Sequence, residues 1–136
     1  MKPAFRNRPH AYVKLWKHHG GQEQAERMIA LAKERNEPWL SRYGNTLSSE
    51  FAIPKLLETL EKDPEVHHTM DHFVDAVDWI VWQLTWNYVR SAGATGYKAL
   101  FQDGQFPSTT DYFKGLDPDF ENVGRGEARR AGRAAR

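Results

Sequence analysis

The hydrophobic and polar positions between Asp71 and Phe101 organise this chain, because they hold its longest apolar run and three of its five tryptophans. Apolar residues recur there at i, i+3, i+4, i+7 and i+11, the spacing of one face of an α-helix. They are Phe73, Ala76, Val77, Ile80 and Leu84. Asp71, Asp75 and Asp78 fall together on another face. The pattern predicts a central helix with a buried apolar stripe, and it excludes a strand because the charges do not alternate with the apolar residues.

The residues after this helix predict a strand and a turn beside one lysine. Asn87 to Ser91 is a short polar–apolar segment that predicts a strand. The turn Ala92 to Gly96 contains two glycines, which permit a positive φ or the close approach of a ligand. Lys98 follows this turn. On pattern alone a solvated surface lysine is the commoner explanation, so the layout indicates only a cation beside a loop.

Helices dominate the rest of the chain. Helical spacing of apolar residues and local capping signals predict helices over residues 22–35, 37–43, 47–62 and 108–116. Pro54 belongs in a first turn because proline lacks an N–H, so either the helix within residues 47–62 begins there or a preceding turn from Ser49 is kinked. The helical turn at residues 37–43 is stopped at Gly44. His10 to Trp16 alternates loosely between the two faces of an extended chain, which predicts a strand.

The composition fits one domain or part of one. The chain has 136 residues, of which 40% are hydrophobic and 12% aromatic. A net charge of +1 argues against a general nucleic-acid binder, and the lack of cysteine excludes disulfides and thiolate chemistry. The N-terminus has no apolar signal core, and the central apolar run is too short and too acidic to span a bilayer. We therefore expect a cytoplasmic protein with no membrane partner.

The composition changes abruptly at Gly124. Residues 124–136 contain only Gly, Arg, Glu and Ala, which predicts a disordered tail. Its arginines would suit nucleic acid or an acidic partner. An arginine-rich end also arises when a coding frame is lost in GC-rich DNA, and we expect no nucleic-acid partner.

Side chains that could carry chemistry are few. His68 and His72 are four residues apart, as zinc ligands often are, but no Glu follows His68 as in HExxH. Surface histidines are the commoner explanation, and we expect no metal site. The three aspartates would suit a cation, although acids near a helix N-terminus usually form a solvated face. Trp79 and Trp82 are predicted core residues, whereas Trp16 at a strand end is better placed to meet a ligand. The sequence has no GxxxxGK[ST], GxGxxG or GxSxG motif.

Three stretches carry a family resemblance. They are PHAYVKLWKHH at residues 9–19, SSEFAIPKL at residues 48–56, and DWIVWQLT followed by TGYKAL within residues 78–100. In order and spacing they resemble the bacterial L-ribulokinases, a branch of the FGGY family of carbohydrate kinases. The resemblance implies that residues 1–123 are part of the N-terminal domain of such a kinase, and that residues 124–136 are a tail outside it. That domain is an α/β, helix-rich, actin-like and ribonuclease-H-like fold.

The resemblance also implies an activity, the ATP-dependent phosphorylation of L-ribulose to L-ribulose 5-phosphate in L-arabinose breakdown. In these kinases an aspartate is the general base, and Mg²⁺ and cationic groups stabilise the transferring phosphoryl group. Lys98 matches the lysine of the GYK motif. The resemblance implies that this lysine donates hydrogen bonds to a hydroxyl group of the sugar. Trp16 and Glu50 match positions beside the substrate. We expect these three residues to bind a pentulose, and we assign no catalytic residue.

The chain also departs from the family pattern. The DxGT phosphate loop, the loop with the catalytic aspartate and the adenosine-binding domain are missing from this sequence. We therefore expect ATP and Mg²⁺ to belong to the full-length family, with no cofactor for this chain, and we expect the chain alone to be inactive. Most members continue LTG after the central helix, where Trp86 stands here, a poor residue for a left-handed helix end. A non-catalytic sugar-binding or interaction module is the alternative.

Overall fold

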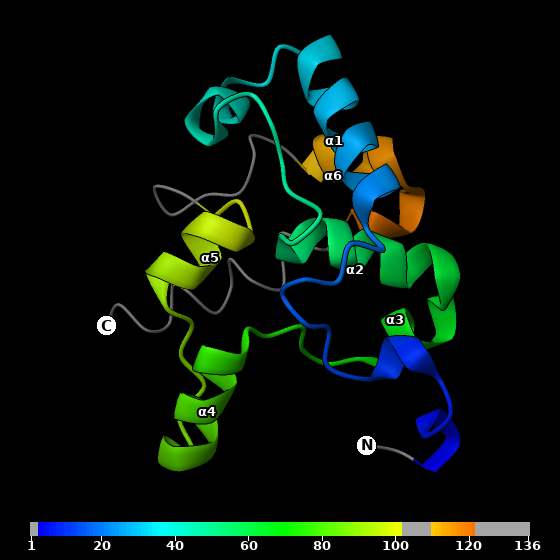
Figure 1. Ribbon diagram of the computed structural model, residues 1–136, viewed down its shortest axis with the longest axis vertical. Coiled ribbons are helices and arrows are strands. Elements are labelled where there is room, and N and C mark those ends of the chain that lie inside the picture. Colours follow the sequence, from blue (N-terminus) through cyan, green and yellow to red (C-terminus); the bar gives the residue numbers. More distant parts are fainter. Residues whose placement is uncertain (1–2, 102–109, 122–136) are drawn as a thin grey trace.

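The computed structural model describes residues 3–101 and 110–121, and these two ranges are helical with no strand (Figure 1). The α-helices are α1 (Gln22–Glu34), α2 (Ala52–Lys62), α3 (Pro64–Thr69), α4 (Ala76–Thr85), α5 (Ala92–Lys98) and α6 (Thr110–Leu116). Short 3-10 helices cover Pro3–Phe5, Pro9–Ala11, Pro38–Tyr43 and Pro118–Phe120. The predicted tail, and the start of the helix predicted at residues 108–116, lie outside the described residues.

The core forms where α1, α2 and α6 pack together (Figure 1). The stripe predicted for the first helix is confirmed, because Met28 and Ala32 are buried in α1 and join Leu57 of α2 in one cluster. Tyr112 of α6 is also buried there, and its hydroxyl donates a 2.7 Å hydrogen bond to the Met28 carbonyl. A buried hydroxyl needs such a partner, so this bond fixes α6 against α1.

The second long helix follows the first of its two predicted alternatives, a start in which Pro54 lies in the first turn. Helix α2 begins at Ala52, inside the predicted span of residues 47–62, which places Pro54 where a residue without an N–H is tolerated. The predicted turn before it is the 3-10 helix Pro38–Tyr43, and it ends at Gly44 with a φ of 67°. That left-handed conformation costs a residue without a Cβ very little.

Both predicted strands are wrong for the described residues. The segment from His10 to Trp16 begins in the 3-10 helix Pro9–Ala11 and continues as irregular chain, and Asn87 to Ser91 is irregular as well. A strand is stable only beside a partner strand, and the described ranges provide none. The structure therefore confirms a helix-rich chain and provides no sheet for an α/β class.

The central helix is shorter than predicted, and its apolar face is not core. Asp75 caps α4, because its side chain accepts a hydrogen bond from the Val77 amide, so the helix begins at Ala76. Only Asp78 of the three aspartates lies within the helix, and it is the buried residue of α4. Trp79 was predicted to be core but is 49% exposed. The apolar run organises a helix that the described part of the chain leaves uncovered.

The glycine-containing segment before Lys98 is helical rather than a flexible turn. Ser91 caps α5 by accepting a hydrogen bond from the Ala94 amide, and the helix ends at Lys98. Capping by a serine side chain satisfies an amide that would otherwise lack a partner. Lys98 is therefore presented from the last turn of a helix. None of the helices in the described ranges combines the length and apolar character needed to cross a bilayer.

Candidate functional site

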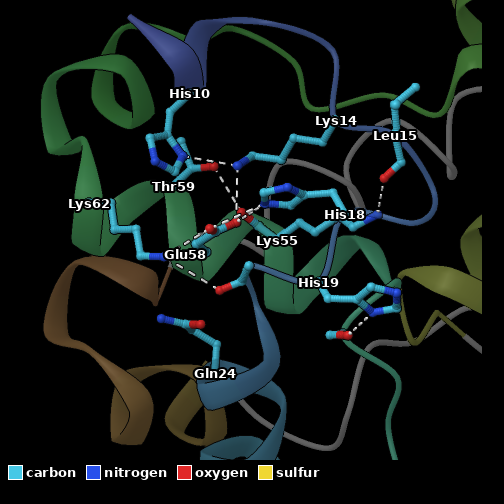
Figure 2. Close-up of polar contacts among 12 residues, drawn as sticks. His10, Lys14, Leu15, His18, His19, Gln24, Lys55, Glu58, Thr59 and Lys62 are labelled. Carbon is cyan, nitrogen blue, oxygen red and sulfur yellow. Dashed lines mark hydrogen bonds and ion pairs between the residues drawn. The ribbon is translucent and has the colours of Figure 1, made fainter.

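The irregular segment that carries Trp16 is held onto α2 by a buried lysine. Lys55 is 4% exposed, and its Nζ donates hydrogen bonds of 2.8 Å to the Leu15 carbonyl and 3.2 Å to the Trp16 carbonyl. Figure 2 shows Lys55 reaching from α2 to the Leu15 carbonyl. The Trp16 side chain itself is 67% exposed. Lys55 thus fixes the backbone at Trp16 while its indole stays accessible.

A buried carboxylate holds the same segment one turn further along α2. Glu58 is 1% exposed and accepts hydrogen bonds from Lys14 Nζ at 3.1 Å, His18 Nε2 at 2.9 Å and Lys62 Nζ at 3.1 Å (Figure 2). Burial alone would raise the pKa of Glu58, but these three partners lower it to about 2. The carboxylate is therefore ionised near neutral pH and attaches the segment at two points, Lys14 and His18.

Glu50 lies just before α2, on the side of the segment that carries His19. The Nδ1 atom of His19 lies 3.0 Å from the hydroxyl of Ser49, a buried residue, and its Nε2 atom lies 4.0 Å from a Glu50 carboxylate oxygen. The Glu50 side chain is 36% exposed. Glu50 is therefore a partly exposed carboxylate next to the segment that carries Trp16.

Lys98 approaches from the end of α5. Its Nζ lies 3.2 Å from Asp75, and its side chain is 40% exposed. An ammonium group has three donors, so Lys98 keeps donors for another partner after this ion pair. Asp75 both caps α4 and orients Lys98, which links the two helices.

The charges of two predicted site residues, Glu50 and Lys98, act on the pKa of Lys55. Burial lowers the pKa of Lys55; the negative charge of Glu50 opposes this shift, and the positive charge of Lys98 adds to it. The Trp16 carbonyl is bonded to the Lys55 ammonium directly. The ring of Tyr97, next to Lys98, lies 5.3 Å from the ring of Phe51, next to Glu50, so α5 contacts the chain just before α2.

A groove lies beside this cluster. It has a volume of about 660 Å³ and is lined by the 3-10 helix Pro38–Tyr43, the residues before α2 and helix α5. Its lining residues are Arg42, Tyr43, Thr46, Ser48, Phe51, Ala92, Gly93, Gly96 and Tyr97. Ser48 and Phe51 flank Glu50 in sequence, and Tyr97 precedes Lys98. None of the three predicted site residues lines the groove, so we place the candidate site at the Lys55 cluster, where charged side chains converge.

The described residues hold no group of three or more histidine or acidic side chains placed to bind a metal ion. His68 and His72, which are four apart in sequence, have different neighbours. His68 lies 3.7 Å from Asp119, whereas His72 stacks on Tyr88 with ring centroids 4.6 Å apart. Asp78 pairs with Arg90 at 3.1 Å rather than joining the other aspartates in a cation site.

Sequence reasoning missed the two residues that hold the candidate site together. Lys55, Glu58 and Lys62 are spaced i, i+3 and i+7, so they share one face of α2. That spacing was visible in the sequence, but charged residues in such a row usually face solvent. Lys55 and Glu58 are nevertheless buried, while Lys62 stays exposed. Their burial follows from the N-terminal segment lying over them, in contacts between residues more than thirty positions apart in the chain.

Several known ribulokinases match the chain. It is 52% identical to the ribulokinase of Mycolicibacterium smegmatis over 116 residues, and this aligned stretch covers 85% of the chain and 20% of that protein. It is 42% identical over 125 residues to the ribulokinase of Anoxybacillus flavithermus, covering 90% of this chain and 22% of that protein. It is also 42% identical over 119 residues to the ribulokinase of Staphylococcus aureus strain Newman, covering 88% of this chain and 22% of that protein. No protein-family model matches the chain.

These matches define the class first: the chain is a relative of carbohydrate kinases. More narrowly, it is homologous to a segment of the ribulokinases, as the three motif stretches indicated. The chain spans about a fifth of the length of the curated relatives it matches.

Proposed function

We propose that this chain forms part of the pentulose-binding side of an ATP-dependent ribulokinase. The reaction is the phosphorylation of L-ribulose to L-ribulose 5-phosphate in L-arabinose breakdown, in the cytoplasm. The observation that supports the proposal is that Trp16 and Glu50 lie at the N-terminal end of α2, and that α5, which ends at Lys98, contacts the same end, in a chain homologous to ribulokinases. Folded as part of an α/β, actin-like kinase domain, this cluster would face the sugar.

Each residue has a role that suits a polyhydroxylated sugar. The Lys98 ammonium donates to a sugar hydroxyl with the donors left after its ion pair with Asp75. Glu50 accepts from a second hydroxyl, because a carboxylate is an acceptor when it is ionised. Trp16 packs its exposed indole against the apolar face of the sugar. Lys55 keeps the Trp16 backbone in place without touching the substrate.

The chemical step belongs to the rest of the kinase. ATP, Mg²⁺ and the general base are supplied by parts of the full-length family that this sequence does not contain, and the chain's own residues hold and orient the sugar. Orientation alone contributes to rate, because it replaces a chance encounter with a fixed geometry. We therefore propose that the isolated chain does not turn over substrate.

The test is a chimera in which this chain replaces the matched 116-residue stretch of the M. smegmatis ribulokinase. ADP release is measured with ATP, Mg²⁺ and L-ribulose for the chimera and for the isolated 136-residue chain. We expect L-ribulose-dependent ADP release from the chimera and none from the isolated chain. A folded chimera without activity contradicts the proposal, and turnover by the isolated chain contradicts its division of roles.

A non-catalytic sugar-binding module is the second candidate, favoured by the partly exposed Lys98 ammonium, which keeps donors after its ion pair with Asp75. It predicts that L-ribulose binds the isolated chain with measurable heat, and that Lys98→Ala weakens this binding. Titration calorimetry on a folded sample of the isolated chain distinguishes the two candidates. Only the sugar-binding module requires heat of binding from this chain alone, because the kinase proposal needs the rest of a ribulokinase.

A further inference from the structure

Helix α4 presents almost no charge to solvent. Its ten residues, AVDWIVWQLT, include one ionisable side chain, Asp78, and that side chain turns inward. Asp78 is 3% exposed and pairs with Arg90 at 3.1 Å. It also accepts a 3.0 Å hydrogen bond from the Ser91 amide. The single charge of the helix is thus used to attach it to the following segment, and the surface left over is uncharged.

The apolar side chains of α4 lie on that uncovered surface. The exposed residues are Val77 at 52%, Trp79 at 49%, Ile80 at 51%, Val81 at 45% and Leu84 at 78%, followed by Trp86 at 89% just after the helix. At 100° per residue these positions are spread around much of the helix rather than along one stripe. A helix that is apolar nearly all round normally lies inside a larger protein. Figure 1 shows α4 projecting away from the packed group of α1, α2 and α6.

We propose that α4 is a docking surface for the remaining part of a ribulokinase-length chain. The matched relatives are roughly five times as long as the stretch they share with this chain, so most of such a chain lies outside these residues. Apolar patches as extensive as this one mark interaction surfaces. The occupant is an apolar, uncharged surface that encloses α4 on several sides, because a charge opposite it would be buried without a partner.

A second copy of this chain fits the exposure less well. In a twofold dimer each α4 would contact the partner along one face. The opposite face, with other members of the Val77, Trp79, Ile80, Val81 and Leu84 set, would stay in water. A surrounding domain covers several faces at once. The proposal does not depend on the proposed kinase activity, because its test measures folding.

The test compares Leu84→Glu in the isolated 136-residue chain and in the M. smegmatis chimera, using thermal unfolding. We expect the Tm of the isolated chain to change by less than about 2 °C, because Leu84 is exposed there. In the chimera we expect a loss of more than about 8 °C, because the new charge is buried without a partner. Leu84→Ala, which adds no charge, should lower the Tm of the chimera by about half as much as Leu84→Glu does. It replaces Leu84→Glu in the comparison if the chimera with that variant does not fold. Ala30→Glu on the exposed side of α1 is the matched control and should change neither.

Each other outcome overturns the proposal. Equal losses in the two proteins mean that α4 is already packed within this chain. No loss in the chimera means that α4 stays exposed in the longer protein. Sedimentation equilibrium of the isolated chain provides the third comparison: a dimer that Leu84→Glu dissociates identifies a second copy as the occupant.

Discussion

Glu58 provides the sharpest test of how the candidate site is built. Replacing it with glutamine keeps the shape of the side chain and removes the charge that Lys14, His18 and Lys62 share. The pKa of Glu58 falls from an ordinary value of 4.5 to about 2 in the folded chain, which corresponds to about 3 kcal/mol of stabilisation by the ionised form. We expect Glu58→Gln to lower the free energy of unfolding by about that amount at pH 7.

The pH dependence of this loss follows from the sign of the shift. A carboxylate with a lowered folded pKa contributes its full stabilisation above the unfolded value of 4.5, and loses it as the pH falls through the folded value of about 2. The difference between the native chain and Glu58→Gln should therefore stay near 3 kcal/mol at pH 7 and pH 5, and shrink to about 1 kcal/mol at pH 3.

Urea unfolding at the three pH values measures this difference, with Glu34→Gln as the control. Glu34 is an exposed acid on α1, and its loss should change stability by less than about 0.5 kcal/mol. A Glu58→Gln deficit that does not shrink between pH 5 and pH 3 would refute the assignment of an ionised, triply paired Glu58. So would a deficit as small as that of the control.

Two further predictions concern the ends of α4. Trp86 adopts a φ of 57° at the end of the helix, a left-handed conformation that a Cβ disfavours. Trp86→Gly should therefore raise the free energy of unfolding in urea by about 1 kcal/mol, whereas Trp86→Ala, which keeps the Cβ, should not. Equal gains from the two variants would show that the backbone is not strained at this position. Asp78→Ala should cost about 3 kcal/mol, because it removes the carboxylate that pairs with the buried Arg90 guanidinium. Asp71→Ala, at an exposed position, should cost less than about 0.5 kcal/mol. Similar values for the two alanine variants would contradict the buried ion pair.

Local patterns predicted the elements that pack within this chain. The stripe of α1 and the proline in the first turn of α2 were readable because each depends on a few neighbouring residues. The strand predictions failed because a strand needs a partner that the described residues do not contain. The α4 stripe gave the right helix and the wrong burial, since a hydrophobic pattern shows what must be covered and not which part of a protein covers it.

The candidate site was predictable mainly where a residue could be matched to a family motif. Lys98, Trp16 and Glu50 were assigned as sugar ligands from the resemblance, and that they bind a sugar stays a prediction. Trp16 was also singled out at the end of a predicted strand, which the described residues do not form. Lys55 and Glu58 could not be found in this way, because their burial depends on how the N-terminal segment crosses α2. Nothing in the local sequence encodes that crossing.

The most direct test of the central claim is the effect of Lys98→Ala on L-ribulose phosphorylation by the chimera. We expect kcat/KM for L-ribulose to fall about 10- to 100-fold, the loss of a charged hydrogen bond to the sugar, while the KM for ATP is unchanged. Lys33→Ala, which removes an exposed lysine on α1, should leave both values as they were. If Lys98→Ala and Lys33→Ala behave alike in a chimera that is active, the sugar does not meet Lys98, and the site proposed around Lys55 is wrong.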